Sequence, residues 1–104
     1  MKILLKTTLI SFAMLITATA ADHIINQKGK MFIPSEITIT AGDTLTFKNS
    51  DPFAHNAFTD DKANEFDIGK QVSNIDKTII IKKAGTFNIE CAIHPKMLLK
   101  VIVK

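Results

Sequence analysis

Cysteine is nearly absent from this chain: Cys91 stands alone among 104 residues, and tryptophan, tyrosine and arginine are missing altogether. A single cysteine cannot form an intrachain disulfide, which excludes the disulfide framework that stabilises many small exported domains. Internal repeats, low-complexity tracts and linkers are missing too. The sequence therefore predicts one small domain that must be stable without disulfides.

The first twenty residues are predicted to be a secretory signal peptide. Lys2 and Lys6 form a basic start, residues 9–16 are almost entirely apolar, and Ala18-Thr19-Ala20 is a small-residue cleavage motif. A membrane anchor is the alternative, but the apolar run is shorter than the about 20 residues that a spanning helix needs. No cysteine follows that could carry a lipid. We expect export to the periplasm without a membrane anchor, with cleavage after Ala20 or, as the nearest alternative, after Ala21.

Without residues 1–20 the charge of the chain is almost balanced. Residues 21–104 carry 11 lysines against 10 acidic residues, a net charge of +1. No strongly basic face is expected that could neutralise phosphates, so nucleic-acid binding loses its main support. A domain of this size buries only about 60–70% of its unfolded surface. A bound metal would therefore be a useful stabiliser, because it binds the folded state alone.

Apolar residues recur at every second position through most of residues 21–104, which is typical of strands with one face on a core. Turn signals separate these segments at Lys28-Gly29, Ala41-Gly42-Asp43, Ile68-Gly69 and Ala84-Gly85. Many short strands with regular turns predict an all-β sandwich. No segment of this domain predicts a convincing helix, and residues 59–64 are compatible with at most a short helical turn. The alternating apolar positions are Ile37 and Ile39; Leu45 and Phe47; Ile79 and Ile81; Phe87, Ile89 and Cys91; and Met97, Leu99, Val101 and Val103.

Cys91, His94 and Met97 are spaced three residues apart, and one further histidine, His55, lies upstream in the segment 51–56. Together they offer a thiolate, two imidazoles and a thioether. This is the ligand set of a blue-copper site, in which a cysteine and two histidines form a trigonal arrangement and a methionine binds weakly on the axis. The four residues are therefore predicted to be the metal ligands.

Strand alternation predicts that Cys91 and Met97 both face the core, at the end of one strand and the start of the next. Pro95 follows His94 and restricts the backbone of the histidine before it. Because the connecting loop is short, the three side chains are expected to converge at one end of the sandwich.

Taken singly, each of these residues has an ordinary interpretation. A lone cysteine is usually a small buried hydrophobic residue, a lone methionine fills a core, and a loop histidine is solvated. An unpaired thiol in an exported protein is prone to oxidation unless it is shielded or ligated. The combination is what favours a metal site over these separate interpretations.

Four other polar or sulfur-containing features are interpreted as structural. We expect His23 to be an exposed histidine that binds no metal, and Met31 to serve packing. Glu90 alternates away from the core, and Asp60-Asp61 is interpreted as a charge pair in a loop.

Residues 21–104 resemble the cupredoxins, in particular the small plastocyanin-like and amicyanin-like group. The resemblance is carried by Phe32-Ile33-Pro34, by the segments 41–47 and 91–97, and by Ala54-His55-Asn56. It implies a Greek-key β-sandwich that holds one type 1 copper ion, with His55, Cys91 and His94 as equatorial ligands and Met97 as the axial ligand. It also implies that the backbone N–H of Asn56 points at the Cys91 sulfur and that His94 lies near the surface, where electrons pass.

The resemblance further implies a one-electron carrier between redox proteins rather than an enzyme, and we expect a monomer. Copper delivery or buffering with the same ligands is the alternative, although this chain has no cluster of methionines and histidines beyond the site. A thiol enzyme built on Cys91 and His94 is disfavoured, because an inward sulfur beside Met97 leaves no room for substrate.

The sequence departs from its apparent relatives next to the histidine. Where amicyanin-like proteins have an aromatic residue after the proline, this chain has Lys96, and where they have a glycine two residues after the methionine it has Leu99. The docking surface near His94 therefore carries a cation. We expect the redox partner to offer a carboxylate to Lys96.

Overall fold

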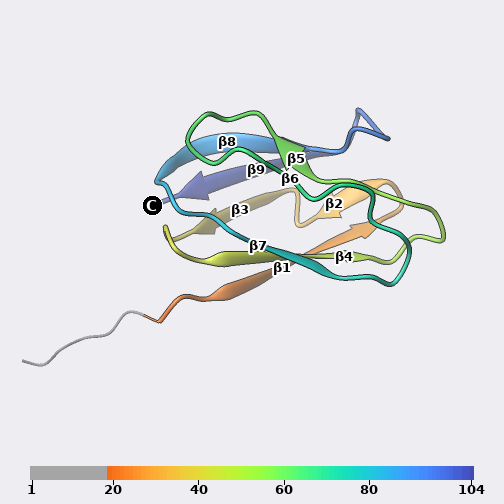
Figure 1. Cartoon of the computed structure of the whole chain (residues 1–104), viewed down its shortest axis with the longest axis horizontal. Coiled ribbons are helices and arrows are strands. Elements are labelled where there is room, and N and C mark those ends of the chain that lie inside the picture. Colours follow the sequence, from red (N-terminus) through yellow and green to blue (C-terminus); the bar gives the residue numbers. More distant parts are fainter. Residues whose placement is uncertain (1–18) are drawn as a thin grey trace, which may run out of the picture.

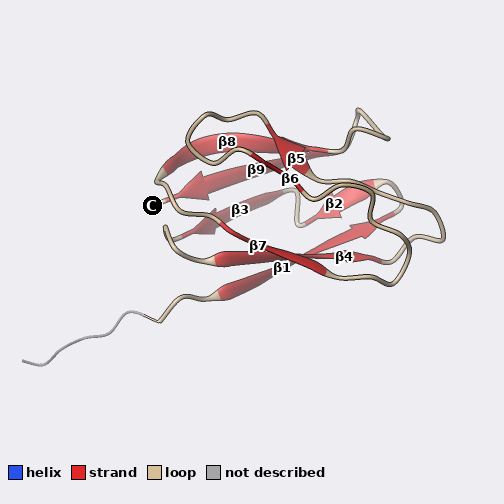
Figure 2. Ribbon diagram, viewed as in Figure 1, coloured by secondary structure: helices blue, strands red, loops and turns tan. Residues whose placement is uncertain are grey.

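The computed structural model describes residues 19–104, which form a two-layered β-sandwich (Figure 1). The predicted signal peptide lies outside the described residues except for Thr19 and Ala20. Figure 2 shows strands and loops but no helix in the described part of the chain. Among these residues, none forms a helix long and apolar enough to cross a membrane.

The first sheet has the strand order β2-β1-β4-β7. Its strands are β1 (Asp22–Lys28), β2 (Met31–Ile33), β4 (Thr44–Asn49) and β7 (Lys77–Ile80). β1 and β4 run parallel, and the other neighbours are antiparallel. β1 and β2 are consecutive in the chain, but β1, β4 and β7 are not, so the chain must leave this sheet and return to it.

The second sheet has the order β3-β9-β8-β5-β6. It contains β3 (Glu36–Ile39), β5 (Phe58–Thr59), β6 (Phe66–Asp67), β8 (Gly85–Glu90) and β9 (Leu98–Val103). β3 and β9 are parallel, whereas β8 and β9 form a six-residue antiparallel ladder. The chain passes repeatedly between the two sheets, which confirms the predicted all-β sandwich and agrees with the Greek-key form that the cupredoxin resemblance implies.

The core lies between the sheets and follows the predicted alternation. Leu45 and Phe47 of β4 and Leu99 of β9 are fully buried, and Phe32 packs edge-on against Phe47 with their ring centroids 6.2 Å apart. Full burial of one such side chain contributes about 1.5–3 kcal/mol. The alternating pattern therefore fixes which face of each strand is inside.

Two expectations about individual segments are wrong. Residues 59–64 form no helix: Lys62–Asn64 is a single turn, in which the N–H of Asn64 donates to the carbonyl of Asp61 at 3.1 Å. The buried Asn64 side chain makes two hydrogen bonds of 3.0 Å with the backbone of Lys83: its Nδ2 donates to the carbonyl, and its Oδ1 accepts from the N–H. Met31 does not pack in the core but is 56% exposed.

The strand ends place two groups of residues at opposite ends of the sandwich (Figure 1). The loop 91–97 joins β8 to β9, and the segment 50–57 joins β4 to β5 at that same end. At the other end lie the C-terminus and the start of β1, where the N–H of Ala41 donates to the carbonyl of Lys104 at 3.0 Å. The predicted ligands therefore gather at one end.

Candidate metal centre

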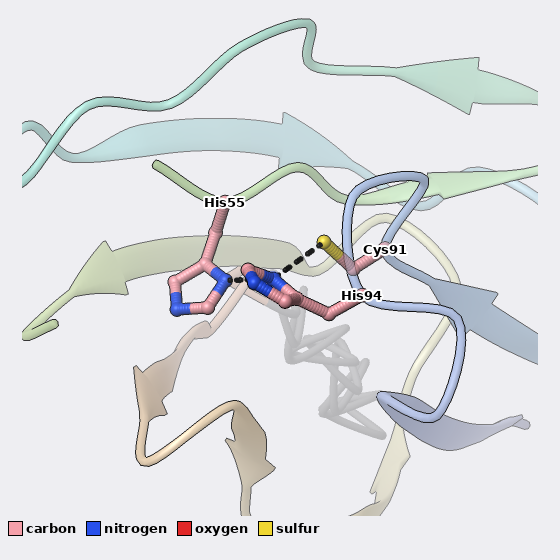
Figure 3. A group of neighbouring side chains, drawn as sticks. All are labelled: His55, Cys91 and His94. Atoms are coloured by element: carbon pink, nitrogen blue, oxygen red, sulfur yellow. Dashed lines mark hydrogen bonds between the residues drawn. The ribbon is translucent and has the colours of Figure 1, made fainter. Parts of the chain in front are cut away.

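Three of the four predicted ligands converge in space. One donor atom from each of His55, Cys91 and His94 lies within 4.8 Å of the other two. Figure 3 shows the two imidazole rings and the thiol facing one another, with the two Nδ1 atoms 3.1 Å apart and the Cys91 Sγ 3.8 Å from the Nδ1 of His94. Residues that are 36 positions apart in sequence thus form one cluster of nitrogen and sulfur donors.

The ring of His55 is fixed in orientation by Asp51. Its Nε2–H donates to Oδ2 of Asp51 at 2.7 Å, and the ring is fully buried. The main chain of His55 is held as well, by two hydrogen bonds of 2.8 and 2.9 Å with the backbone of Gln71. Because Nε2 faces Asp51, Nδ1 is the ring nitrogen that faces Cys91 and His94 and that could bind a metal.

Asp51 is a buried carboxylate with three donors around it. Besides His55, the backbone N–H groups of Gly29 and Lys30 donate to it at 2.8 and 3.1 Å. Burial raises the pKa of Asp51, but the hydrogen bonds from His55, Lys30 and Gly29 outweigh it and lower the pKa below its usual value. The group is therefore ionised and remains an acceptor for the His55 ring.

His94 is held by a tight turn and by an aromatic side chain. The N–H of Met97 donates to the carbonyl of His94 at 3.0 Å, so residues 94–97 form a turn with Pro95 at its second position, where proline is favoured. The centroid of the Phe53 ring lies 5.5 Å from that of the His94 ring and 5.4 Å from that of the His55 ring. Burial, followed by the charges of His55 and Lys30, lowers the pKa of His94, which favours the neutral ring that a metal requires.

Cys91 and Met97 flank this turn and point inward, as predicted: each is 1% exposed. Cys91 directly follows β8 and Met97 directly precedes β9. The donor set is thus one buried thiol, one buried and one partly exposed imidazole, and a buried thioether on the loop that also carries Cys91 and His94. Soft sulfur with imidazole suits copper and suits neither magnesium nor calcium, which take oxygen ligands.

Asn56 ties the two ligand-bearing segments together through its side chain. Its Oδ1 accepts the N–H of Ala92 at 3.0 Å, and its Nδ2 donates to Oδ1 of Asp67 at 2.8 Å and to the carbonyl of Gly69 at 2.9 Å. The hydrogen bonds that the structure gives Asn56 are therefore side-chain bonds that fix the loop after Cys91. The contact between its backbone N–H and the Cys91 sulfur stays a prediction.

The remaining sequence candidates lie elsewhere. His23 is at the opposite end of the sandwich, where its Nε2 pairs with Asp43 at 2.9 Å. Glu90 is half-buried rather than fully solvated, and Asp61 accepts backbone hydrogen bonds in its loop. Sequence reasoning missed Asp51 and Phe53 as supports of the site. Their positions four and two residues before His55 were the available signal.

Comparison with known proteins agrees with this site. Residues 20–104 match the family of copper binding proteins described as the plastocyanin/azurin family. A fold of two mixed β-sheets with a cysteine and two histidines at one end defines a cupredoxin, and this chain belongs to the plastocyanin/azurin family. Copper is accordingly its metal.

Several relatives illustrate the similarity. The chain is 28% identical over 97 residues to the chloroplastic plastocyanin minor isoform of Arabidopsis thaliana, covering 81% of this chain but only 57% of that protein. It is 34% identical over 76 residues to plastocyanin of Ginkgo biloba, covering 61% of this chain and 75% of that one. Among solved structures, a reduced mutant form of amicyanin superposes with a TM-score of 0.73 at 24% identity, covering 86% of this chain and 87% of that one.

A domain of this kind also occurs inside a larger protein. The copper-containing nitrite reductase of Thermus scotoductus SA-01 superposes with a TM-score of 0.72 at 26% identity. The match covers 78% of this chain and 22% of the reductase. The fold is therefore shared by proteins of different architecture, and the site, not the fold, must support a functional assignment.

Proposed function

We propose that this protein is a periplasmic one-electron carrier whose single type 1 copper ion is bound by His55, Cys91, His94 and Met97. The observation that carries the proposal is the convergence of one donor atom each from His55, Cys91 and His94 within 4.8 Å, with the first two residues buried and His94 partly exposed, in a chain of the plastocyanin/azurin family. Bound copper supplies a Cu(I)/Cu(II) couple, and this mixed ligand set suits neither oxidation state fully.

The surrounding residues support electron transfer because they hold the donors in place. Asp51 fixes the ring of His55, and Asn56 fixes the loop that carries Cys91 and His94. Such contacts orient metal ligands and limit how far they move. A site that rearranges little when it gains or loses an electron favours carriage over catalysis, so we propose no enzymatic activity.

The surface around His94 is proposed to receive the redox partners. His94 is partly exposed and borders a hollow of about 360 Å³ that is also lined by Lys30, Ile93, Pro95 and Lys96. Ile93 is 48% exposed, so the rim combines an apolar patch with two lysines. Lys30 was not anticipated from the sequence, and it strengthens the inference that the partner presents carboxylates here.

Docking is tested by measuring electron-transfer rates with cognate partners at several ionic strengths. Charge reversal in Lys96→Glu should slow transfer and reverse its dependence on salt, because association is steered by opposite charges. Lys104→Glu, at the opposite end, is the matched control and should leave transfer unchanged. Rates that do not respond to salt or to Lys96→Glu would exclude a carboxylate partner at this surface.

The copper site itself is tested with residues 21–104 and Cu(II). An intense blue band from thiolate-to-copper charge transfer is expected, and it should disappear in Cys91→Ser. The exposed Ser50→Ala variant should keep the band. Absence of the band in the unmodified chain would refute the electron-carrier proposal. Sedimentation of the copper-loaded chain tests the further proposal that it is a monomer.

A further inference from the structure

The first residues after the predicted signal peptide bring two nitrogen donors together, far from the cluster of His55, Cys91 and His94. The backbone nitrogen of Ala21 lies 3.0 Å from Oδ1 of Asp43, and Nε2 of His23 lies 2.9 Å from Oδ2 of the same carboxylate. Asp43 is 6% exposed, and the N–H of Thr40 also donates to it at 3.0 Å. A single carboxylate therefore holds both donors.

Cleavage after Ala20 would turn the Ala21 nitrogen from a peptide N–H into a free amine. The exported chain would then begin Ala21-Asp22-His23, with an amine on its first residue and an imidazole on its third. In such a sequence the amine, the amide nitrogens of residues two and three, and the imidazole Nδ1 can surround one metal ion in a plane. A square-planar set of nitrogen ligands is the geometry that Cu(II) and Ni(II) favour.

The hydrogen bond to Asp43 determines which ring nitrogen of His23 is available. The backbone N–H groups of Ala21 and Thr40 both donate to Asp43, each at 3.0 Å, so its carboxylate acts as an acceptor here. The Nε2 of His23 must therefore carry the hydrogen that it shares with Asp43. Nδ1, the nitrogen that the planar chelate requires, is left for a metal.

Few contacts hold Ala21, Asp22 and His23 in the first sheet. β2 pairs only with residues 26–28 of β1, so Asp22 and His23 have a neighbouring strand on one side alone, β4. The N–H of Thr44 donates to the carbonyl of Ala21 at 2.9 Å, and the hydroxyls of Thr44 and Thr46 donate to Asp22. Ala21 and Asp22 are exposed. To surround a metal ion, only residues 21–23 have to separate from β4. This breaks their hydrogen bonds to Thr44 and Thr46 and the two hydrogen bonds to Asp43.

We propose that the processed amino terminus, Ala21-Asp22-His23, is a second Cu(II) site. This replaces the expectation from the sequence that His23 binds no metal. In the absence of metal, hydrogen bonds to Asp43 keep the Ala21 nitrogen and His23 in place. Binding releases one proton from the terminal ammonium group and one from each of the two amides, and the oxidation state of copper does not change. The proposal rests on cleavage after Ala20. It does not depend on electron transfer at the other end of the molecule.

The first test is the identity and copper content of the exported chain. The protein is exported from cells with its own leader, purified without metal, and its mass is measured; a chain that begins at Ala21 is expected, and one that begins at Asp22 would overturn the proposal. Cu(II) is then titrated into the Cys91→Ser variant, which lacks the blue-copper thiolate. Electron paramagnetic resonance should show a square-planar ion with four nitrogen ligands.

Two matched variants isolate the terminus. One glycine inserted between Ala20 and Ala21 keeps the amine but moves His23 to the fourth place, and His23→Gln keeps the amine but removes the imidazole. Both should lose one Cu(II) per chain and the four-nitrogen spectrum. Equal copper content and spectra in all three chains would overturn the proposal.

The role of Asp43 is tested by the rate of uptake. Asp43→Asn weakens the hydrogen bonds to the Ala21 amine and to Nε2 of His23. Cu(II) should therefore bind at the terminus several-fold faster than in the parent chain. A rate unchanged or slower would overturn this role of Asp43. The blue band of the Cys91-containing protein is recorded separately, so failure at the terminus and failure of the proposed carrier function are distinguished.

Discussion

Replacing Asp51 with asparagine tests how far the copper site depends on a residue that binds no metal. Asp51 accepts hydrogen bonds from the His55 ring at 2.7 Å, from the Gly29 N–H at 2.8 Å and from the Lys30 N–H at 3.1 Å. Asparagine has nearly the same shape but only one acceptor oxygen, and its amide group turns a donor toward other donors. At least one of the three donors must lose its partner.

The magnitude follows from the charge and burial of this group. A hydrogen bond to a charged partner contributes about 1.5–3 kcal/mol, and the metal-free Asp51→Asn variant should lose about that much unfolding free energy. In a domain of this size each kcal/mol lowers Tm by about 4–8 °C, so a fall of at least about 6 °C is expected. Copper affinity should fall about 10–100-fold, because the His55 ring loses the group that orients it.

The assays are urea unfolding of the metal-free protein and competition for copper against a chelator of known affinity. Asp76→Asn is the matched control: its carboxylate pairs with Lys48 at 3.5 Å, but both side chains are about half exposed. Exposed pairs contribute about 0–1 kcal/mol, so the control should keep its copper affinity. Equal copper affinities of Asp51→Asn and Asp76→Asn would refute the role assigned to Asp51.

Three further predictions concern packing, the ligand loop and acid stability. Leu99→Ala, at a fully buried position, should cost about 2–5 kcal/mol of unfolding free energy. Leu98→Ala, at a position that is 50% exposed, should change it by less than about 0.5 kcal/mol. Similar urea midpoints for the two variants would show that the inward face of β9 is misassigned. Asn56→Ala should cost about 1–3 kcal/mol, because the N–H of Ala92 loses its acceptor, while the exposed Asn88→Ala should be neutral in the same unfolding assay. The pKa of Asp43 is lowered to about 2. The stabilisation that this carboxylate provides is therefore complete above its ordinary pKa near 3.8 and is lost as pH falls through about 2. Between pH 5 and pH 2 the Tm of the metal-free protein should fall more steeply than that of Asp43→Asn, and parallel curves would contradict this.

Most of the fold could be predicted from local patterns. The alternation in Phe87, Ile89 and in Leu99, Val101 identifies an inward face, and burial confirms it because a one-residue slip would expose every one of these side chains. The helical turn considered for residues 59–64 does not form, because the Asn64 side chain hydrogen-bonds with the backbone of Lys83, 19 residues away in sequence. No local signal announces such a contact.

The proposed metal ligands could be singled out in the sequence because their chemistry is carried by residue type and spacing. Cysteine and histidine are rare in this chain, so Cys91, His94 and His55 stand out. The residues that support them do not. Aspartate and phenylalanine have many ordinary roles, and only the folded chain brings Asp51 onto the His55 ring and Phe53 against the two imidazoles.

The sequence by itself determined the strand faces, the donor types and the order Ala21-Asp22-His23, because periodicity and covalent spacing are local properties. Tertiary structure alone decided that the N–H groups of Gly29 and Lys30 donate to Asp51, and that the backbone nitrogen of Ala21 donates to Asp43. It also brought Lys30 to the rim beside His94. These contacts join segments about 20 or more residues apart, and their partners are chosen by strand pairing between distant segments, which no window of sequence contains.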